Sequence, residues 1–177
     1  HACNAAWFRK HYVTPCNAHE EDAAILQGSK SQPKLTQPPS IVGALSLIEN
    51  TFPARFTNAV ALKDGDRVAG LEVMWMPGHT MGSIFLYHRD SGTLFTGDGL
   101  LNAVPPLVHA AGLSLPYPHF CDDYALSLES LRRFLDMDVD VRLLCSGHGA
   151  ARRGPVQEAL RKLLDDAAPH RNERGIA

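Results

Sequence analysis

The stretch LEVMWMPGHTMGSIFLYHRDSGTLFTGDGLL, residues 71–101, decides the fold. Short apolar segments alternate in it with glycine-containing turns, which predicts three successive strands. The turn RDSG at residues 89–92 predicts a hairpin between the second strand and the third. A tight loop then follows the first strand and another follows the third. The apolar content of the strands comes from Val73, Trp75, Ile84, Leu86, Leu94 and Phe95.

Each of these two loops carries one good metal ligand. His79 lies in the segment PGHTMG, and Asp98 lies in TGDG. A third candidate, His148, lies in SGHG, directly after the apolar run at residues 141–145. A lone loop histidine is usually an ordinary surface residue, and an aspartate between glycines usually only forms a turn. Three such residues at three strand ends, however, predict a metal cluster.

The segments PGHTMGS, FTGD and SGHG also have an informative order, since Asp98 follows His79 by 19 residues and His148 follows Asp98 by 50. In this order and in their flanking residues they resemble the third, fourth and fifth motifs of the metallo-β-lactamase superfamily. The resemblance implies an α+β fold, the four-layer αββα sandwich, in which two mixed sheets pack face to face with helices outside. Periodicity alone predicts only a mixed α and β domain.

The same family has a first signature, a His-x-His-x-Asp-His run followed by an amphipathic helix. The chain opens HACNAAWFRKH, which resembles the last histidine of that run and the helix behind it. By this resemblance His1 is a metal ligand, and the domain is N-terminally incomplete. The sequence does not begin with Met, so we expect a truncated, cleaved or incompletely recorded chain. The alternative for His1 is a tag or cloning remnant.

The resemblance implies two neighbouring metal ions. One would be held by the two absent histidines with His79, the other by the absent Asp with His1 and His148, and Asp98 would bridge them. Such a pair provides a metal-bound hydroxide at neutral pH and polarises the scissile carbonyl or phosphoryl group. Histidine and carboxylate ligands suit Zn²⁺ best, two ions per complete domain, although Fe or Mn is accommodated. Three hydroxyls could orient the ligands or could simply serve the turns, namely those of Thr80, Ser83 and Thr96.

The composition agrees with a single enzyme domain spanning residues 1–177, since 45% hydrophobic residues can form a sizeable core. A net charge of −2 gives no electrostatic case for nucleic acid or a membrane surface. No apolar run approaches the roughly 20 residues of a membrane span. The four cysteines lack Cys-x-x-Cys spacing, which predicts free thiols in a reducing cytoplasm. We therefore expect a cytoplasmic protein with a small-molecule substrate, and its oligomeric state stays open.

Outside the central stretch we expect a helix over residues 2–11, a short strand over 12–18 and a second helix opened by the acidic run at 19–22. In many family members the histidine at the start of this second helix has no metal role, so His19 is left out of the predicted site. Residues 27–40 are polar and predict a loop. A short helix over 41–51 and extended structure over 52–67 follow. Amphipathic helices are expected over 122–135 and from Pro155 onward, before a frayed tail at 169–177.

A long loop at residues 103–120 leaves the strand end that carries Asp98. It is rich in proline and contains His109, Tyr117, His119 and Phe120. Loops at such strand ends often form a wall of the substrate site, although surface cover or a subunit contact is equally open. The loop has no Arg or Lys to hold a phosphate. This favours a carboxylic ester or thioester over a phosphoester.

Departures from known branches narrow what the resemblance implies. The principal true β-lactamases have Cys or Ser where this chain has Asp98. Glutathione thioesterases of the glyoxalase II type add a helical region after the fourth motif, and nucleic-acid enzymes insert a large domain there, for which this chain has no room. What remains is a compact, glyoxalase II-like zinc hydrolase acting on a small ester, thioester or lactone. The alternatives are a non-haem iron oxidoreductase resembling persulfide dioxygenases and an inactive metal-binding fragment.

Overall fold

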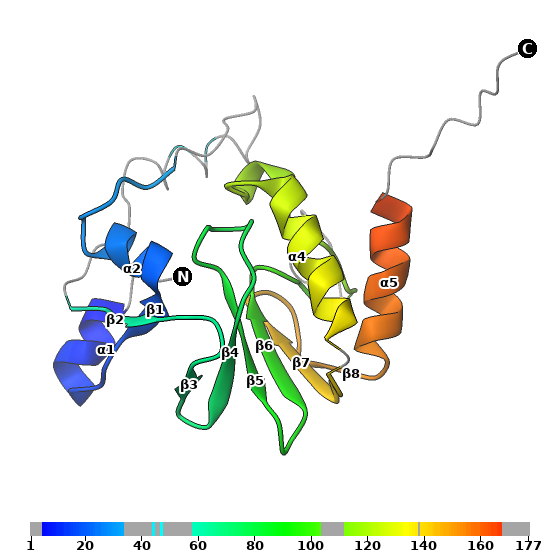
Figure 1. Ribbon diagram of the computed structural model, residues 1–177, viewed down its shortest axis with the longest axis horizontal. Coiled ribbons are helices and arrows are strands. Elements are labelled where there is room, and N and C mark those ends of the chain that lie inside the picture. The colour runs from blue at the N-terminus through cyan, green and yellow to red at the C-terminus, as the bar shows by residue number, and fades with distance from the viewer. Residues whose placement is uncertain are drawn as a thin grey trace, which may run out of the picture.

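The computed structural model describes residues 5–33, 44, 47, 58–103, 112–137 and 139–167. A six-stranded mixed sheet forms its centre, and a two-stranded parallel sheet lies beyond one end of it (Figure 1). In chain order the elements are α1 (Ala5–Tyr12), β1 (Asn17–His19), α2 (Glu20–Leu26), β2 (Val60–Leu62), β3 (Arg67–Val68), β4 (Leu71–Trp75), β5 (Ile84–His88), β6 (Thr93–Gly97), the 3₁₀ helix η2 (Pro118–Phe120), α4 (Tyr124–Asp136), β7 (Leu143–Ser146), β8 (Arg152–Arg153) and α5 (Val156–Ala167).

The large sheet has the order β3-β4-β5-β6-β7-β8. All of its neighbouring strands are antiparallel except β6 and β7, which are parallel. The predicted hairpin is present, with His88 paired to Thr93 across the turn. Because β4 and β6 are both antiparallel to β5, β4 runs in the same direction as β6 and β7. The loops that follow these three strands therefore lie at the same end of the sheet, beyond the carboxyl ends of the strands. The three candidate ligands occur in these loops.

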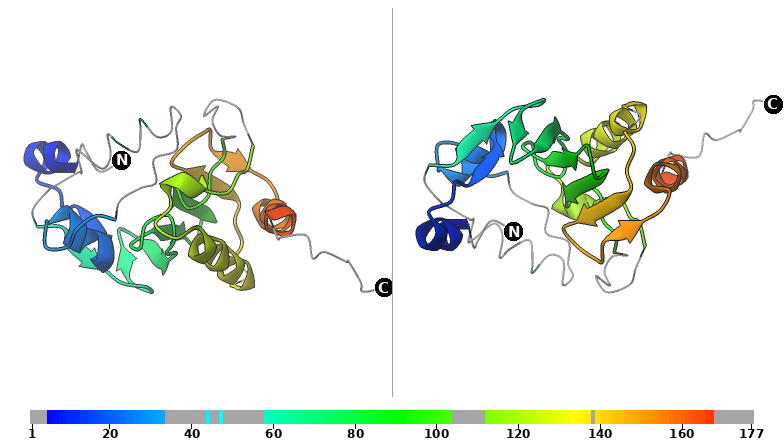
Figure 2. Two further views of the ribbon diagram at one scale, coloured as in Figure 1. Left: turned by 90° about the horizontal axis from the view of Figure 1, so that it is seen from above. Right: turned by 90° about the horizontal axis from the view of Figure 1, so that it is seen from below.

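Helices α4 and α5 cover one face of the large sheet (Figures 1 and 2). On this face Phe85 of β5 meets Phe134 of α4 edge to face, with ring centroids 5.4 Å apart. Both side chains are fully buried, and burial of each contributes about 1.5–3 kcal/mol to stability. From α5, Leu160 and Leu164 join the same core. The strands that carry the candidate ligands at their carboxyl ends are thus supported by the packed layer of α4 and α5.

The apolar residues of the central strands divide between the two faces of the large sheet. In β5 the buried side chains are Phe85 and Tyr87, while Ile84 and Leu86 are half-buried on the opposite face. Phe95 of β6 is 41% exposed. The reason is the period of two along a strand, since α4 and α5 cover only one set of alternating residues.

The N-terminal elements form a smaller unit beside the β3–β4 end of the large sheet (Figure 2). Strands β1 and β2 pair in parallel, and Ala23 of α2 packs with Ala59 in a small cluster. The strand expected over residues 12–18 is wrong in extent, because α1 continues to Tyr12 and β1 begins only at Asn17. Val13 has a φ of 49° in the left-handed region, and Pro15 cannot donate to a ladder, so neither suits a strand.

The two C-terminal helices are confirmed. Helix α4 begins after Asp123, whose carboxylate accepts a hydrogen bond from Leu126 N at 2.9 Å, and α5 begins directly after Pro155. The second helix is confirmed as α2. The helix expected over 41–51 lies outside the described residues apart from Ala44 and Leu47, as do the tail at 169–177 and residues 34–40 of the polar loop. Among the described helices, none is long and apolar enough to cross a membrane.

Candidate metal centre

Asp98 lies between the imidazoles of His79 and His148. His79 Nε2 is 3.8 Å from Asp98 Oδ2, and His148 Nε2 is 3.7 Å from Asp98 Oδ1. Each imidazole therefore faces a different oxygen of one carboxylate. The Asp98 side chain is 15% exposed, whereas His148 is 39% exposed, so solvent reaches the group from the His148 side. The geometry is that of a carboxylate shared between two nitrogen ligands.

Adjacent parallel strands place Asp98 and His148 side by side. Asp98 directly follows β6, and His148 lies two residues beyond β7. Between the two loops, Gly147 N donates a hydrogen bond to Gly97 O at 2.7 Å. A Cβ at residue 147 would lie 2.0 Å from Asp98 Oδ1 and 3.1 Å from Gly97 O, so a larger residue there would displace the shared carboxylate or the backbone. The glycines around these ligands thus allow the two loops to approach each other.

The loop at residues 76–83 places His79, and it rests on the first half of α4 and the residue before it. Ser130 Oγ donates to Pro77 O at 2.7 Å, and Asp123 N donates to Gly78 O at 2.9 Å. A Cβ at Gly78 would lie 2.2 Å from Ser127 N, and the φ of 136° is also one that favours glycine. The backbone before His79 is therefore seated directly on the helix.

Two carboxylates from distant elements hold the same loop after His79. Asp22 of α2 accepts from Thr80 Oγ1 at 2.7 Å and from Gly82 N at 3.0 Å. On the other flank Asp122 accepts from Met81 N at 3.0 Å, and its own N–H donates to His79 O at 3.0 Å. Burial is the largest influence on Asp122 and raises the pKa of its carboxyl, with the nearby charge of Asp22 acting in the same direction and the Met81 hydrogen bond against it.

Neutral groups hold the loop of His148. Ser146 Oγ donates to His148 O at 2.7 Å and accepts from Asn102 N at 3.0 Å. Asn102, 5% exposed, also donates through Nδ2 to Ala150 O at 2.7 Å. A Cβ at Gly149 would lie 2.0 Å from Asn102 O. The segment that continues from Asp98 thus supports the loop of His148 as well.

The end of the predicted substrate wall lies beside His79. Cys121 Sγ is 4.0 Å from His79 Nδ1 and 3.5 Å from Tyr117 O, to which it donates. Burial first, and then the charges of the two following aspartates, raise the pKa of the Cys121 thiol to about 12, so it is protonated at neutral pH. The ring of Tyr117 lies near those of His119 and Phe120, at centroid distances of 5.3 and 6.0 Å. His109 lies outside the described residues.

The distances among His79, Asp98 and His148 can be compared with those between the ligands of one bound metal ion. Two ligands bound to one tetrahedral zinc at about 2.0–2.1 Å lie about 3.3 Å apart. The two separations from Asp98 exceed that value by a few tenths of an ångström. Within the described ranges no group of three or more His, Cys, Asp or Glu side chains could hold a metal ion. The two distances from Asp98 do fit the shared part of a two-metal site, with two of these ligands for each ion. His1 lies outside the described residues.

The other residues considered in the sequence have structural contacts. His19 is buried, caps α2 by accepting from Glu21 N at 3.4 Å, and stacks on Trp75. Thr80 and Ser83 hydrogen-bond to each other within the loop of His79, and Thr96 Oγ1 donates to Leu100 O. Cys16, Cys121 and Cys145 are free thiols. Sequence reasoning did not identify the supports of the two loops, which are Asp22, Asp122 and Asn102, because each contact joins segments more than 40 residues apart.

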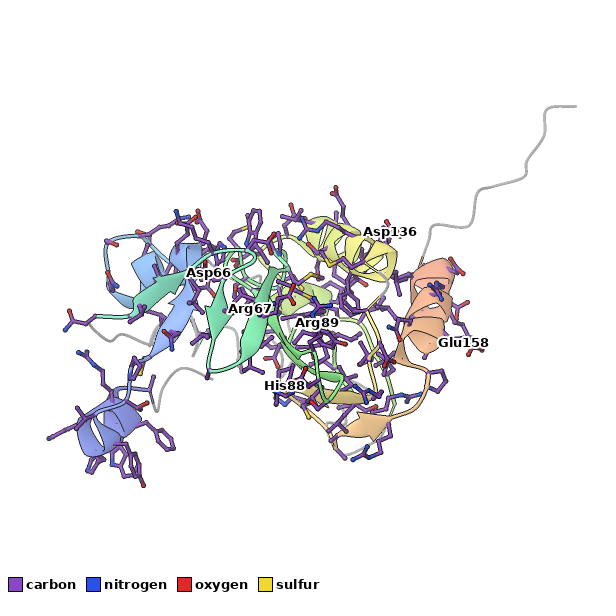
Figure 3. The ribbon with its side chains drawn as sticks, turned by 60° about the horizontal axis from the view of Figure 1, so that its bottom comes forward. Asp66, Arg67, His88, Arg89, Asp136 and Glu158 are labelled. Carbon is purple, nitrogen blue, oxygen red and sulfur yellow. The ribbon has the colours of Figure 1, made fainter. Side chains whose placement is uncertain are left out.

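A shallow depression lies at the opposite end of β4 and β5 from His79. Its lining includes Arg67 of β3, His88 at the end of β5 and Arg89, all of which Figure 3 labels. Arg89 is 2.6 Å from Glu72, which neutralises its charge. The depression is therefore separate from the site at Asp98 and offers no comparable group of ligands.

Comparison with known proteins agrees with this geometry. The family model of the metallo-β-lactamase superfamily matches residues 1–148. The chain belongs to this superfamily. A solved metallo-β-lactamase family protein from Thermus thermophilus has the same fold, with a TM-score of 0.62 and 23% identity, over 94% of this chain and 56% of that one. The expected α+β fold of the metallo-β-lactamase type is thereby confirmed. In the described residues its two sheets are the six-stranded mixed sheet and the two-stranded parallel sheet.

Two curated relatives of this chain have names that describe an activity. A probable metallo-hydrolase of Bacillus subtilis, YflN, is 26% identical over 157 residues, which are 82% of this chain and 58% of that protein. A hydroxyacylglutathione hydrolase of Cereibacter sphaeroides is 37% identical over 93 residues, 50% of this chain and 32% of that protein. The chain thus spans less than two thirds of the length of either relative.

Proposed function

We propose that this chain is part of a metal-dependent hydrolase that cleaves a small ester, thioester or lactone, with zinc as its metal. The observation that carries the proposal is the placement of Asp98 between the Nε2 atoms of His79 and His148. When bound, a metal pair there would act as a Lewis acid toward the scissile carbonyl and lower the pKa of water at the site.

The residues of the chain would position that metal pair and admit the substrate. Asp98 would be the common ligand, with His79 holding one ion and His148 the other. The greater exposure of His148 leaves the approach on its side open to solvent and substrate. On the side of His79, the rings of Tyr117 and Phe120 and the protonated thiol of Cys121 would form an apolar wall.

The substrate class follows from the charge near this wall. Residues 112–123 contain no Lys or Arg but end in Asp122 and Asp123, so the wall would repel a phosphate. A carboxylic ester or thioester, which has no phosphate to hold, fits better. Similarity to a hydroxyacylglutathione hydrolase supports hydrolysis of an acyl substrate, and similarity to a probable metallo-hydrolase supports metal-dependent hydrolysis.

The test compares three substrates with one metal-loaded preparation. We expect S-lactoylglutathione or 4-nitrophenyl acetate to be hydrolysed at least 100-fold faster than bis(4-nitrophenyl) phosphate, and elemental analysis to find zinc. Asp98→Asn should reduce ester hydrolysis by at least 100-fold, because it changes the ligand shared by both ions. Glu158→Gln, on the surface of α5, is the matched charge control. Faster phosphodiester cleavage, or full activity of Asp98→Asn, would overturn the proposal.

A further inference from the structure

Asp22 links the N-terminal unit to the loop of the metal centre. It lies in the first turn of α2, and its two oxygens accept from two different residues of that loop, Oδ2 from Thr80 and Oδ1 from Gly82. The two bonds span the backbone immediately after His79. A charged acceptor with two bonds at 2.7 and 3.0 Å restrains its partners more than a single neutral bond does.

The contact involves the helix backbone as well as the side chain. A Cβ at Gly82 would lie 2.4 Å from Asp22 Cγ and 2.6 Å from Asp22 N. Glycine at residue 82 therefore lets the loop lie directly against α2. Thr80 is also fixed locally, because its N–H donates to Ser83 Oγ at 2.9 Å. The residue that follows His79 is thus held through both its backbone and its hydroxyl.

Asp22 acts on only one of the two histidine loops. The contacts described for the loop of His148 come from Ser146 and Asn102, and α2 contributes none of them in the part of the chain that the structure describes. His19, three residues before Asp22, stacks on Trp75 with its ring 3° from parallel. The start of α2 is therefore docked against the strand that leads into the loop of His79 as well as against the loop itself.

We propose that Asp22 is a positioning residue for His79. By holding Thr80 and Gly82, it directs His79 Nε2 toward Asp98 Oδ2, and it makes the docking of α2 a requirement for one half of the metal centre and not for the other. The inference rests on the proposed function for its consequence, which is selective metal affinity at the His79 position. It adds a role for the N-terminal unit that the ligand set alone does not provide.

The experiment measures the histidine side chains directly. We would record ¹H–¹⁵N long-range NMR spectra of the metal-free protein, assign the rings with His79→Gln and His148→Gln, and compare Asp22→Ala, Asp22→Asn and Glu21→Ala. Glu21 is the matched control, because it is on the same helix and has the same charge but pairs with Lys30. Asp22→Ala should shift the ring signals of His79 and leave those of His148 in place. Asp22→Asn, which keeps one acceptor oxygen, should recover most of the wild-type position, and Glu21→Ala should match wild type.

Zinc affinity gives the second measurement, by competition with a chromophoric chelator. Loss of a group that orients a ligand typically costs about 10–100-fold in metal affinity. We expect a loss of that size in one zinc-binding step of Asp22→Ala and none in the other. If Asp22→Ala does not fold, Thr80→Val, which removes only the hydroxyl donor to Asp22, should shift the His79 ring in the same direction.

The outcomes separate the two proposals. Unmoved His79 signals in both Asp22→Ala and Thr80→Val would overturn the positioning role, and so would equal shifts of His79 and His148. A selective His79 shift in a protein that binds no zinc or hydrolyses no ester would uphold the positioning role and reject the proposed function alone.

Discussion

The loop of His79 and the loop of His148 approach the same carboxylate but are supported differently. The first depends on two charged side chains, Asp22 and Asp122, that come from elements far away in the sequence. The second depends on neutral groups of Asn102, which lies beyond the end of β6, and of Ser146, the last residue of β7. The His79 side should therefore respond to pH and to the docking of α2. The position of the His148 ring should respond mainly to changes in the residues at the carboxyl ends of β6 and β7.

The largest effect is expected at Gly147, where the loop of His148 lies against the Asp98 carboxylate. In Gly147→Ala the new Cβ would lie 2.0 Å from Asp98 Oδ1 and 3.1 Å from Gly97 O, so the shared ligand or the backbone must move. We expect a loss of about 1–3 kcal/mol in the free energy of unfolding. Zinc binding should weaken by at least 100-fold in both steps. Urea unfolding and chelator competition measure these two quantities.

Gly65→Ala is the control for this variant. Gly65 has a φ of 80°, and no heavy atom lies within 4 Å of the added Cβ. The Gly65→Ala substitution should therefore cost only the backbone strain of a left-handed alanine, about 1–2 kcal/mol in the free energy of unfolding. Its zinc affinity should equal that of wild type. Normal zinc affinity in Gly147→Ala would mean that the two loops do not depend on their close approach at Asp98.

A smaller effect is expected at the neutral support of His148. Asn102→Ala removes the hydrogen bond from Nδ2 to Ala150 O at a buried residue, which costs about 1–3 kcal/mol. The NMR signals of the His148 ring should shift while those of His79 stay. The loss of stability should be the same at pH 5 and pH 8, because no charge is involved. Asn102→Asp, which places a carboxylate against the same carbonyl, should be less stable still at pH 8. A shift confined to His79 would contradict the comparison.

The ligands could be predicted from the sequence because their signal is local. His79, Asp98 and His148 each follow an apolar strand and lie among glycines, and the strand directions then bring them to one edge of the sheet. The turn at residues 89–92 and the cap before α4 are equally local. The fold beyond a mixed α and β domain required the family resemblance, because the pairing of β6 with β7 joins segments about 50 residues apart.

The supports of the loops could not be predicted in this way. The acidic first turn of α2 is fully explained by the helix dipole, so nothing in the sequence indicates that Asp22 reaches Gly82, 60 residues away. Asp122 similarly reads as part of a helix N-terminus. The burial of Phe85 rather than Ile84 also depends on which face α4 covers. These features come from tertiary packing, which a single sequence does not encode in any short segment.

The smallest effect is expected at Asp122. The direction in which its contribution to stability changes with pH tests whether the ionised carboxylate stabilises the loop of His79. Burial raises the pKa of the Asp122 carboxyl above the ordinary 3.8, so the folded chain binds more protons than the unfolded chain across the interval between these two pKa values. The contribution of Asp122 to stability therefore falls as the pH rises through that interval. Asp122→Asn keeps an oxygen for Met81 N but does not ionise, so its stability relative to wild type should increase from pH 3.5 to pH 7. Urea unfolding at several pH values measures the difference, with Glu158→Gln as a surface control. A relative stability that decreases with pH would mean that the hydrogen bond from Met81 outweighs burial, and that the ionised carboxylate stabilises the loop of His79.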